Sequence, residues 1–452
     1  MKQCYNIKNY IFGEIYMSNL SVDFTRSLGK IKPMHAVNNV QTVPYDFYGG
    51  LDILAEANIP YARLHDTGYY SSITPLVDIA NIFPDFDADE NDPYSYDFSF
   101  TDVLLSEMNE KGIKPFYRLG ATIENYHKIK AYNIYPPKDF SKWARICEHI
   151  IMHYNEGWAN GFHMDIEYWE IWNEPDNEPI AEENPCWRGT KEEFFELYRI
   201  TSTYLKEKFP HLKIGGYASC GFYAITNTFI KSANSSPRKE YFIDFFENFL
   251  DYSQKNSCVI DFFSWHSYAS VEQNVIYARY ARERLDSYGF TKCEVFLNEW
   301  NPGYKNRGKA RDAADVLAMM IAMQNTPTDM CMYYDAAERS VYCGIFDPIT
   351  HGVFKTYYAF FIFGQMYAMG EQCFCQSSEK DVFVIAAKGT DKKAFAIVND
   401  SESEKAVELS VNGADLSCGK VMATDDTHTF DKIKSIDKQI ILPPFSIRYV
   451  EF

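Results

Sequence analysis

Two glutamates in this chain stand in settings that suit acid–base and nucleophilic chemistry. Glu174 lies between Asn173 and a proline, and Glu299, 125 residues further along, lies between an asparagine and Trp300. Each closes an apolar, β-rich run, so both are expected at strand ends rather than on helix faces. Cleavage of a glycosidic bond requires one acid to protonate the leaving oxygen and one carboxylate to attack the anomeric carbon. The sequence therefore indicates a glycosidase.

The two carboxyl groups need different environments. Glu174 must be protonated near neutral pH to act as an acid, so we expect burial and the charge of Glu299 to raise its pKa. Glu299 must stay ionised and needs hydrogen-bond donors around it. Three residues at the ends of predicted strands are candidates to supply them: Arg63, His266 and Tyr268.

Other polar and aromatic residues are candidates for substrate contacts. Asn173 is expected to donate to the sugar 2-hydroxyl, with a helix-capping asparagine as the alternative. His65 is expected to bind a ring hydroxyl rather than serve as a core histidine, and Trp300 and Tyr334 either stack on the sugar or pack in the core. Three further candidates are included because they lie at the ends of the first and eighth predicted strands: His35, Asp335 and Glu338.

Eight βα units are expected to position these residues. From about residue 31 to 370, short β-branched or aromatic runs alternate with longer amphipathic stretches. The predicted strands are Ile31 to Ala36, Ile59 to His65, Ile113 to Leu119, Tyr168 to Asn173, Lys213 to Tyr217, Asp261 to Tyr268, Glu294 to Asn298 and Met330 to Asp335. A (β/α)8 TIM barrel of these units brings Glu174 and Glu299 together at its C-terminal face, where such barrels carry their active sites.

A second, antiparallel β domain is expected after the barrel. Short β runs such as Val382 to Ala387 and Ala394 to Val398 are separated by Asn-Asp and Asn-Gly turn signals. The first residues, which alternate around Tyr10 to Tyr16, are expected to add an edge strand to this domain. The predicted α/β organisation is an N-terminal strand in residues 1–30, a catalytic barrel in residues 31–370 and an accessory β domain in residues 371–452.

Composition narrows the range of partners. A net charge of −18, from 44 basic and 62 acidic residues, opposes binding to nucleic acid or to an anionic membrane. A small, neutral carbohydrate is the expected partner. Eleven cysteines without close pairing do not resemble a disulfide framework, and the N-terminus lacks the features of a secretory signal, so a cytoplasmic location is predicted. The sequence leaves a homo-oligomer open.

No cofactor and no metal are expected. His149 and His153 have the i, i+4 spacing of metal ligands, but the sequence suggests no third ligand. Both belong to a predicted outer helix, far from the strand ends that carry the glutamates.

Several motifs, taken in order, resemble glycoside hydrolase family 39, the β-xylosidase and α-L-iduronidase family of the 4/7-barrel superfamily, clan A. They are Tyr61-Ala62-Arg63-Leu64-His65, Gly112-Ile113-Lys114-Pro115-Phe116, the segment from Pro136 to Trp143, the Trp-Asn-Glu-Pro block at residues 172–175, Lys213-Ile214-Gly215-Gly216 and the segment from Asp261 to His266. The Trp-Asn-Glu-Pro block marks the superfamily, and the ordered set marks the family. The resemblance implies that Glu174 is the acid/base, that Glu299 is the nucleophile and that the C-terminal domain is a β-sandwich.

The end of the eighth predicted strand departs from the family pattern. The family has a Tyr-Trp-Thr-Phe-type segment and an acidic loop that grips the far hydroxyls of the sugar, whereas this chain reads Tyr333-Tyr334-Asp335-Ala336-Ala337-Glu338. Tyr334 stands in place of the tryptophan, so substrate choice is expected to depend on Tyr334, Asp335 and Glu338.

The expected activity is a retaining, β-xylosidase-like hydrolysis of small neutral oligosaccharides or glycosides by double displacement, through a glycosyl ester on Glu299. An arabinosidase, a uronic-acid hydrolase or an endo-glycosidase of the same clan remains open. A different class of protein, a carbohydrate-binding protein without activity, is the further alternative.

Overall fold

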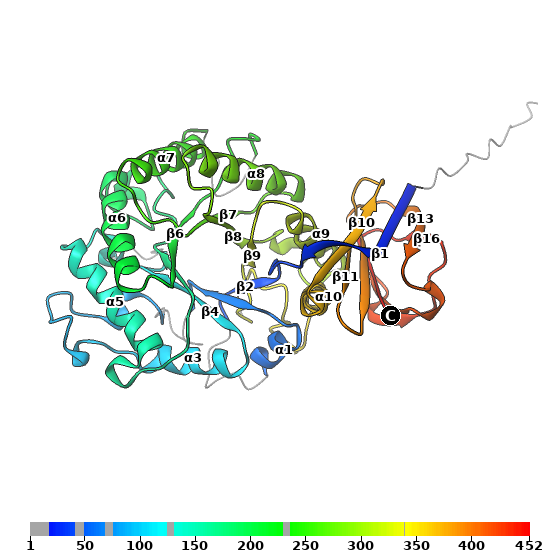
Figure 1. Cartoon of the computed structure of the whole chain (residues 1–452), viewed down its shortest axis with the longest axis horizontal. Helices are drawn as coiled ribbons and strands as arrows, with labels where there is room; N and C mark the ends of the chain where they lie inside the picture. Colours follow the sequence, from blue (N-terminus) through cyan, green and yellow to red (C-terminus); the bar gives the residue numbers. More distant parts are fainter. Residues whose placement is uncertain (1–17, 41–48, 68–75, 124–130, 229–235, 339) are drawn as a thin grey trace, which may run out of the picture.

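The computed structural model consists of a closed barrel and a nine-stranded sheet beside it (Figure 1), and it describes residues 18–40, 49–67, 76–123, 131–228, 236–338 and 340–452. The predicted α/β fold class, a (β/α)8 barrel with a C-terminal β domain, is confirmed. Neighbouring barrel strands are parallel, and the last pairs with the first to close the ring. The barrel strands are β2 (Ala36–Asn38), β3 (Tyr61–Leu64), β4 (Lys114–Leu119), β5 (Tyr168–Ile171), β6 (Lys213–Ser219), β7 (Phe262–Ser267), β8 (Glu294–Trp300) and β9 (Met330–Tyr333).

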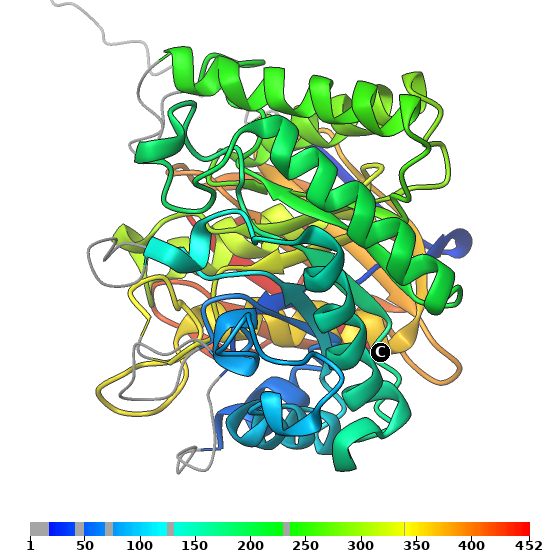
Figure 2. The same cartoon turned by 90° about the vertical axis from the view of Figure 1, so that its left-hand side faces the viewer.

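Helices surround the barrel, and those coloured cyan to green lie in front of its strands when the molecule is viewed from the barrel side (Figure 2). Two begin with capping boxes: Thr190 and Glu193 exchange side-chain and backbone hydrogen bonds at the start of α6, and Ser270 and Gln273 do so at α8. The helices are α1 (Gly50–Glu56), α2 (Ile79–Ile82), α3 (Ser99–Glu110), α5 (Phe140–Glu156), α6 (Lys191–Lys208), α7 (Ser236–Lys255), α8 (Val271–Ser287), α9 (Ala310–Gln324) and α10 (Lys355–Met369).

The first barrel strand begins later than the sequence predicted. Residues 31–35 form a connection that contains Pro33 and a turn, and β2 starts only at Ala36. Proline cannot donate a ladder hydrogen bond, which explains why the run does not extend a strand here. His35 therefore lies at the N-terminal end of β2 rather than at the catalytic face.

The second sheet has the strand order β15-β14-β17-β12-β11-β10-β1-β13-β16. β1 (Ser18–Lys30) lies in the interior of this sheet, antiparallel to β10 and parallel to β13. Residues 10–16, on which the expectation of an edge strand rested, lie outside the described residues. The remaining strands are β10 (Glu371–Ser377), β11 (Val382–Lys388), β12 (Lys393–Asn399), β13 (Lys405–Asn412), β14 (Lys420–Thr424), β15 (Thr429–Ile433), β16 (Gln439–Leu442) and β17 (Ser446–Glu451).

The two faces of this sheet bury different sets of side chains. On β12, Phe395 and Ile397 belong to the core of the β domain, whereas Ala396 and Val398 belong to the large core shared with the barrel helices. This alternation follows from the two-residue period of a strand. The sheet therefore has a core of its own on one face and docks against α9 and α10 with the other.

The barrel interior is divided into an apolar base and a polar layer. Seven side chains from six strands form the base: Ala36, Phe116, Tyr168, Phe262, Phe296, Met330 and Met332. Above them, Arg63 donates to Glu170 over 2.7 Å, and both side chains are inaccessible to solvent. Ser264 and Asn298 each donate to the other oxygen of Glu170 at 2.6 Å. This polar layer is the platform on which the residues of the C-terminal face rest.

None of the helices that the structure describes is both long enough and apolar enough to cross a membrane. All ten cysteines in the described part of the chain are free, in agreement with their irregular spacing.

The polar layer predicts a large effect of one isosteric substitution. Glu170→Gln should lower the free energy of unfolding by about 3–5 kcal/mol, because the buried Arg63 loses its compensating charge. The matched control is Glu294→Gln at the opposite end of the barrel, where Glu294 and Lys213 form a partly exposed pair at 3.5 Å; it should change stability by about 1 kcal/mol or less. Denaturant unfolding measures both values, and equal losses would contradict the role given to the Arg63–Glu170 pair.

Candidate active site

A cavity of about 480 Å³ opens at the carboxyl ends of the barrel strands. Seven of the residues singled out from the sequence line it: His65, Asn173, Glu174, His266, Tyr268, Glu299 and Tyr334. Its wall also includes Asp66, Ile123, Asn177, Cys220, Tyr223, Arg238, Phe242 and Tyr342. The volume lies within the range of small-molecule sites, about 300–1,000 Å³.

Glu174 reaches the cavity through a sharp turn directly after β5. Trp172 (φ 72°) and Glu174 (φ 48°) both have left-handed backbone, which costs about 1–3 kcal/mol at a non-glycine residue. The backbone N–H of Trp172 donates to the carbonyl of Leu119, and that of Glu174 donates to the carbonyl of Ala218. Because these carbonyls belong to β4 and β6, the neighbouring strands set the direction of the Glu174 carboxyl group.

Glu299 faces the cavity because β8 is irregular at this point. The pairing of β7 with β8 shifts register between Trp265 and His266, so that His266 pairs with Glu299 instead of Asn298. Such a bulge places one extra residue in a strand and redirects the side chains around it. Asn298 and Glu299, although adjacent in sequence, therefore both contact interior groups, Glu170 and Arg63 respectively.

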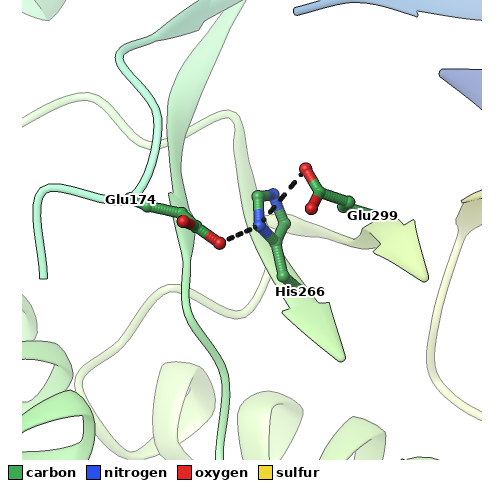
Figure 3. A group of neighbouring side chains, drawn as sticks. All are labelled: Glu174, His266 and Glu299. Carbon is green, nitrogen blue, oxygen red and sulfur yellow. Dashed lines mark hydrogen bonds and ion pairs between the residues drawn. The ribbon is translucent and has the colours of Figure 1, made fainter. Parts of the chain in front are cut away.

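His266 lies between the two glutamates (Figure 3). Its Nδ1 is 2.7 Å from Oε1 of Glu174 and 3.5 Å from Oε2 of Glu299. Tyr268 donates its hydroxyl to the other oxygen of Glu299 at 2.6 Å. Oxygen atoms of Glu174 and Glu299 lie within 4.8 Å of each other, so both carboxyl groups can act on one atom of a ligand.

Arg63 supports this group from below. It donates to Oδ1 of Asn173 at 2.7 Å and lies 3.5 Å from Oε2 of Glu299. Since Oδ1 of Asn173 accepts from Arg63, the orientation of the amide is set, and its Nδ2 hydrogens are directed to an acceptor other than Arg63. A ligand oxygen beside Asn173 is such an acceptor.

Arg238 and Asn177 hold Glu174 from the other side. Arg238 on α7 donates to the backbone carbonyl of Asn177 at 2.6 Å and to its Oδ1 at 2.5 Å. Nδ2 of Asn177 donates to Oε2 of Glu174 at 2.7 Å. With Oδ1 occupied by a guanidinium, Asn177 can offer only a donor to Glu174.

Comparison with known proteins identifies the family of the barrel. A family model described as "Glycosyl hydrolases family 39" matches residues 74–342, which is more than half of the chain. The chain belongs to glycosyl hydrolase family 39. The resemblance inferred from the ordered motifs is thereby confirmed.

Individual relatives are more distant. The chain is 26% identical over 203 residues to a β-xylosidase of Geobacillus stearothermophilus, covering 43% of this chain and 35% of the relative. It is 24% identical over 289 residues to a β-xylosidase of Caldicellulosiruptor saccharolyticus, covering 58% and 52%. The match therefore spans about a third to a half of the length of these relatives.

Solved structures share the fold over almost the whole chain. A glucosidase from Croceicoccus marinus superposes with a TM-score of 0.74 at 20% identity, covering 96% of this chain and 98% of that one. A monomeric β-xylosidase from Caulobacter crescentus superposes with a TM-score of 0.69 at 16% identity, with the same coverage. At these identities the likeness shows the family 39 fold alone.

The pKa shifts of the two glutamates in the ligand-free protein run opposite to the sequence prediction. Burial raises the pKa of Glu174, but the hydrogen bond and positive charge of His266 and the hydrogen bond from Asn177 outweigh it, and the net pKa is lowered. Burial raises the pKa of Glu299, and His266 and Arg63 offset this only in part. The sequence analysis expected His266 beside Glu299 but not beside Glu174, to which its Nδ1 lies closer.

The two histidines of the cavity differ in protonation. Burial lowers the pKa of His266, but the charge of Glu299 and the contact with Glu174 raise it above its ordinary value. Burial and the nearby Arg63 lower the pKa of His65 far below its ordinary value. The surroundings therefore favour the charged form of His266 and the neutral form of His65.

Five candidates from the sequence lie outside the cavity wall. His35 is buried against Phe363 and Tyr367, with Nε2 bonded to the carbonyl of Asn58. Trp300 follows Glu299 on β8 and therefore points to the opposite face, where it packs against Tyr333 in the core. Neither residue lines the cavity: this corrects the prediction for His35, whereas Trp300 takes the core packing that was the stated alternative.

Asp335 and Glu338 are also engaged elsewhere. Asp335 is buried and accepts from Asn39 at 3.4 Å, and Glu338 forms an ion pair with His351 in the loop after β9. Arg63 lies beneath the cavity and reaches it through Glu299 and Asn173. Of the residues expected to decide substrate choice, Tyr334 alone lines the cavity, and its hydroxyl donates to Asp66 at 2.6 Å.

Several lining residues were missed by sequence reasoning. Asp66 follows His65 directly and Asn177 lies three residues after Glu174, so proximity to a motif was a usable signal for both. Arg238 and Phe242 carried no such signal, because they lie on a helix whose contact with the site depends on the closed barrel.

The protonation of the cavity predicts a distinct titration for its two histidines. His266 should titrate above pH 6.5 in ¹⁵N NMR spectra, while His65 should stay neutral to well below that pH. Glu299→Gln should lower the pKa of His266, because it removes a negative charge 3.5 Å away. Glu338→Gln, outside the cavity, is the control and should leave His266 unchanged. A His266 that is neutral at pH 6 in the unmodified protein would contradict this assignment.

Proposed function

We propose that the protein is a retaining, β-xylosidase-like glycoside hydrolase that acts on small neutral glycosides. The observation that carries the proposal is the separation of the two carboxyl groups, whose oxygen atoms lie within 4.8 Å. Retaining glycosidases have carboxyl groups about 5–5.5 Å apart, whereas inverting enzymes need about 6.5–9.5 Å to admit a water. Family membership and the β-xylosidases among the relatives support the same reaction.

In the proposed first step, Glu299 attacks the anomeric carbon while Glu174 protonates the oxygen that leaves. The bond from the anomeric carbon to the leaving oxygen breaks as the ester bond to Glu299 forms. His266 supplies the proton to Glu174: at 2.7 Å from Oε1 it can pass its Nδ1 proton to the carboxylate when a substrate excludes water. The hydrogen bond from Tyr268 and the nearby charge of Arg63 keep Glu299 ionised.

In the proposed second step, Glu174 acts as a base. It removes a proton from a water that attacks the anomeric carbon, and the ester bond to Glu299 breaks. Asn173 is proposed to bind the 2-hydroxyl, with its amide orientation set by Arg63. The sugar leaves with the configuration it had in the substrate.

A cytoplasmic location is included in the proposal, since the ten free cysteines fit a reducing compartment. A carbohydrate-binding protein without activity is the competing function, and turnover of an aryl glycoside separates the two.

The proposed roles predict different defects for the two glutamates. Glu174→Gln should reduce kcat/KM about 10²- to 10⁴-fold for glycosides with poor leaving groups but spare the first step for activated aryl glycosides, which need little protonation. Glu299→Gln should abolish turnover of both kinds. Glu192→Gln, an exposed site on α6, is the matched control. Azide should rescue Glu299→Gly with an inverted product, and an inverted product formed only with Glu174→Gly would show that the roles are reversed.

The proposed mechanism also predicts the stereochemistry. The first product seen by ¹H NMR should have the anomeric configuration of the substrate. A 2-deoxy-2-fluoro glycoside with a good leaving group should trap the ester, and peptide mass spectrometry should find the added sugar on Glu299. An inverted product with no trapped ester would refute the retaining mechanism.

A further inference from the structure

This inference rests on the proposed function, which divides the cavity into two sides. The sugar that is transferred must lie beside Glu299, and the leaving group must lie beyond Glu174. Asp66 and Tyr334 are on the Glu299 side, since Asp66 accepts from the hydroxyl of Tyr334, and the backbone N–H of Tyr334 donates to the carbonyl of Trp300, next to Glu299. Arg238 is on the Glu174 side, bonded to Asn177.

Asp66 is held rigidly at the end of β3. Asn39, which is buried, accepts with Oδ1 from the backbone N–H groups of His65 and Asp66 at 3.3 and 3.0 Å. The same oxygen accepts from the hydroxyl of Thr67 at 3.1 Å. Three donors on one amide oxygen fix the turn that carries Asp66, so the direction of its carboxyl group is preorganised.

The carboxyl group of Asp66 has fewer donors than a carboxylate can accept. Tyr334 donates to Oδ2 at 2.6 Å, and Nε2 of His65 lies 3.2 Å from Oδ1. Within the described residues, Oδ1 has no well-aligned hydrogen bond, and neither has Nδ1 of the buried His65. The Asp66 side chain is 23% exposed, into the cavity that it lines. Because Oδ1 is itself inaccessible to solvent, the acceptor position open to a ligand donor is the second one on Oδ2, beside the hydrogen bond from Tyr334.

The charge on this side excludes one class of sugar. A uronic acid would place its carboxylate near Asp66 and Glu299, both of which carry negative charge when ionised. The buried cations closest in sequence to Asp66 are already bound, Arg63 to Glu170 and Arg118 to Asp78. Arg238, the cation of the described cavity wall, is on the side of the leaving group.

We infer that Asp66 binds hydroxyl groups of the transferred sugar, remote from the anomeric carbon, and thereby selects neutral sugars against uronic acids. In this assignment Asp66, at the end of β3, binds the remote hydroxyls, and Tyr334 orients its carboxylate. Asp335 and Glu338, after β9, do not bind them. Asp66 is a specificity-determining residue and takes no part in bond cleavage.

The test compares the unmodified protein with Asp66→Asn. Asparagine keeps an acceptor for Tyr334 and removes the charge, and Asp85→Asn, an exposed site, controls for net charge. The measurement is kcat/KM for nitrophenyl glycosides of glucose, xylose and glucuronic acid and for the 3-, 4- and 6-deoxy glucosides. Asp66→Asn should reduce kcat/KM about 10- to 100-fold for neutral sugars.

If Asp66 binds the sugar, the effect of Asp66→Asn should depend on the presence of one particular hydroxyl. A purely structural effect of the substitution would not depend on any hydroxyl. For one deoxy glucoside, kcat/KM should already be low with the unmodified protein, because the hydroxyl that Asp66 binds is missing. Asp66→Asn should lower this kcat/KM little further. The discrimination against the glucuronide should fall about tenfold in the variant. Because burial raises the pKa of Asp66 to about 6, the preference of the unmodified protein for the complete sugar should weaken below pH 6, and Asp66→Asn should lack this change.

The outcomes distinguish the inference from the proposed function. If the unmodified protein hydrolyses glycosides, two results would show that Asp66 does not bind the sugar. In the first, the fold loss in kcat/KM caused by Asp66→Asn and the fold loss caused by each missing hydroxyl multiply for every deoxy substrate, so that no hydroxyl is coupled to Asp66. In the second, the unmodified protein prefers the glucuronide. If no glycoside is hydrolysed, the proposed function fails, and NMR titration with free glucose, xylose and their deoxy analogues tests Asp66 alone. Thermal unfolding of Asp66→Asn establishes that the variant is folded.

Discussion

The guanidinium of Arg63 is the group on which the site depends. It is inaccessible to solvent and contacts Glu170 at 2.7 Å, Asn173 at 2.7 Å and Glu299 at 3.5 Å. A buried charge is costly unless its partners are well placed, so the position of Arg63 and the positions of its partners determine one another. The polar layer of the barrel and the reactive carboxylates above it are therefore one electrostatic unit.

The strained turn at Glu174 and the placement of His266 complement this unit. Left-handed backbone at Trp172 and Glu174 is tolerated because hydrogen bonds from neighbouring strands hold it in place. The two adjacent carboxyl groups in turn favour the charged form of His266. Removal of bulk water by a ligand strengthens each of these interactions, because the local dielectric falls.

The sequence was sufficient to predict the barrel and to bring Glu174 and Glu299 to one face, because strand ends and eight βα units determine that geometry. It was not sufficient to predict which neighbours face the cavity. Trp300 follows the inward-facing Glu299 and points away, and the bulge beside Asn298 has no local sequence signature. Arg238 reaches Glu174 through Asn177, a contact between elements about 60 residues apart that exists only in the folded chain.

The course of β1 has a consequence for how the chain is made. This strand is synthesised before the barrel, yet its partners, β10 and β13, begin at residues 371 and 405. The 13 residues of β1 therefore have no strand partners while the entire barrel is synthesised. Their unpaired backbone groups favour association with other chains. Such distant pairing slows folding, and a cut between the barrel and the following strands would leave the nine-stranded sheet without one of its interior members. The β domain can therefore be completed only after the whole barrel has been synthesised, with a strand that precedes the barrel.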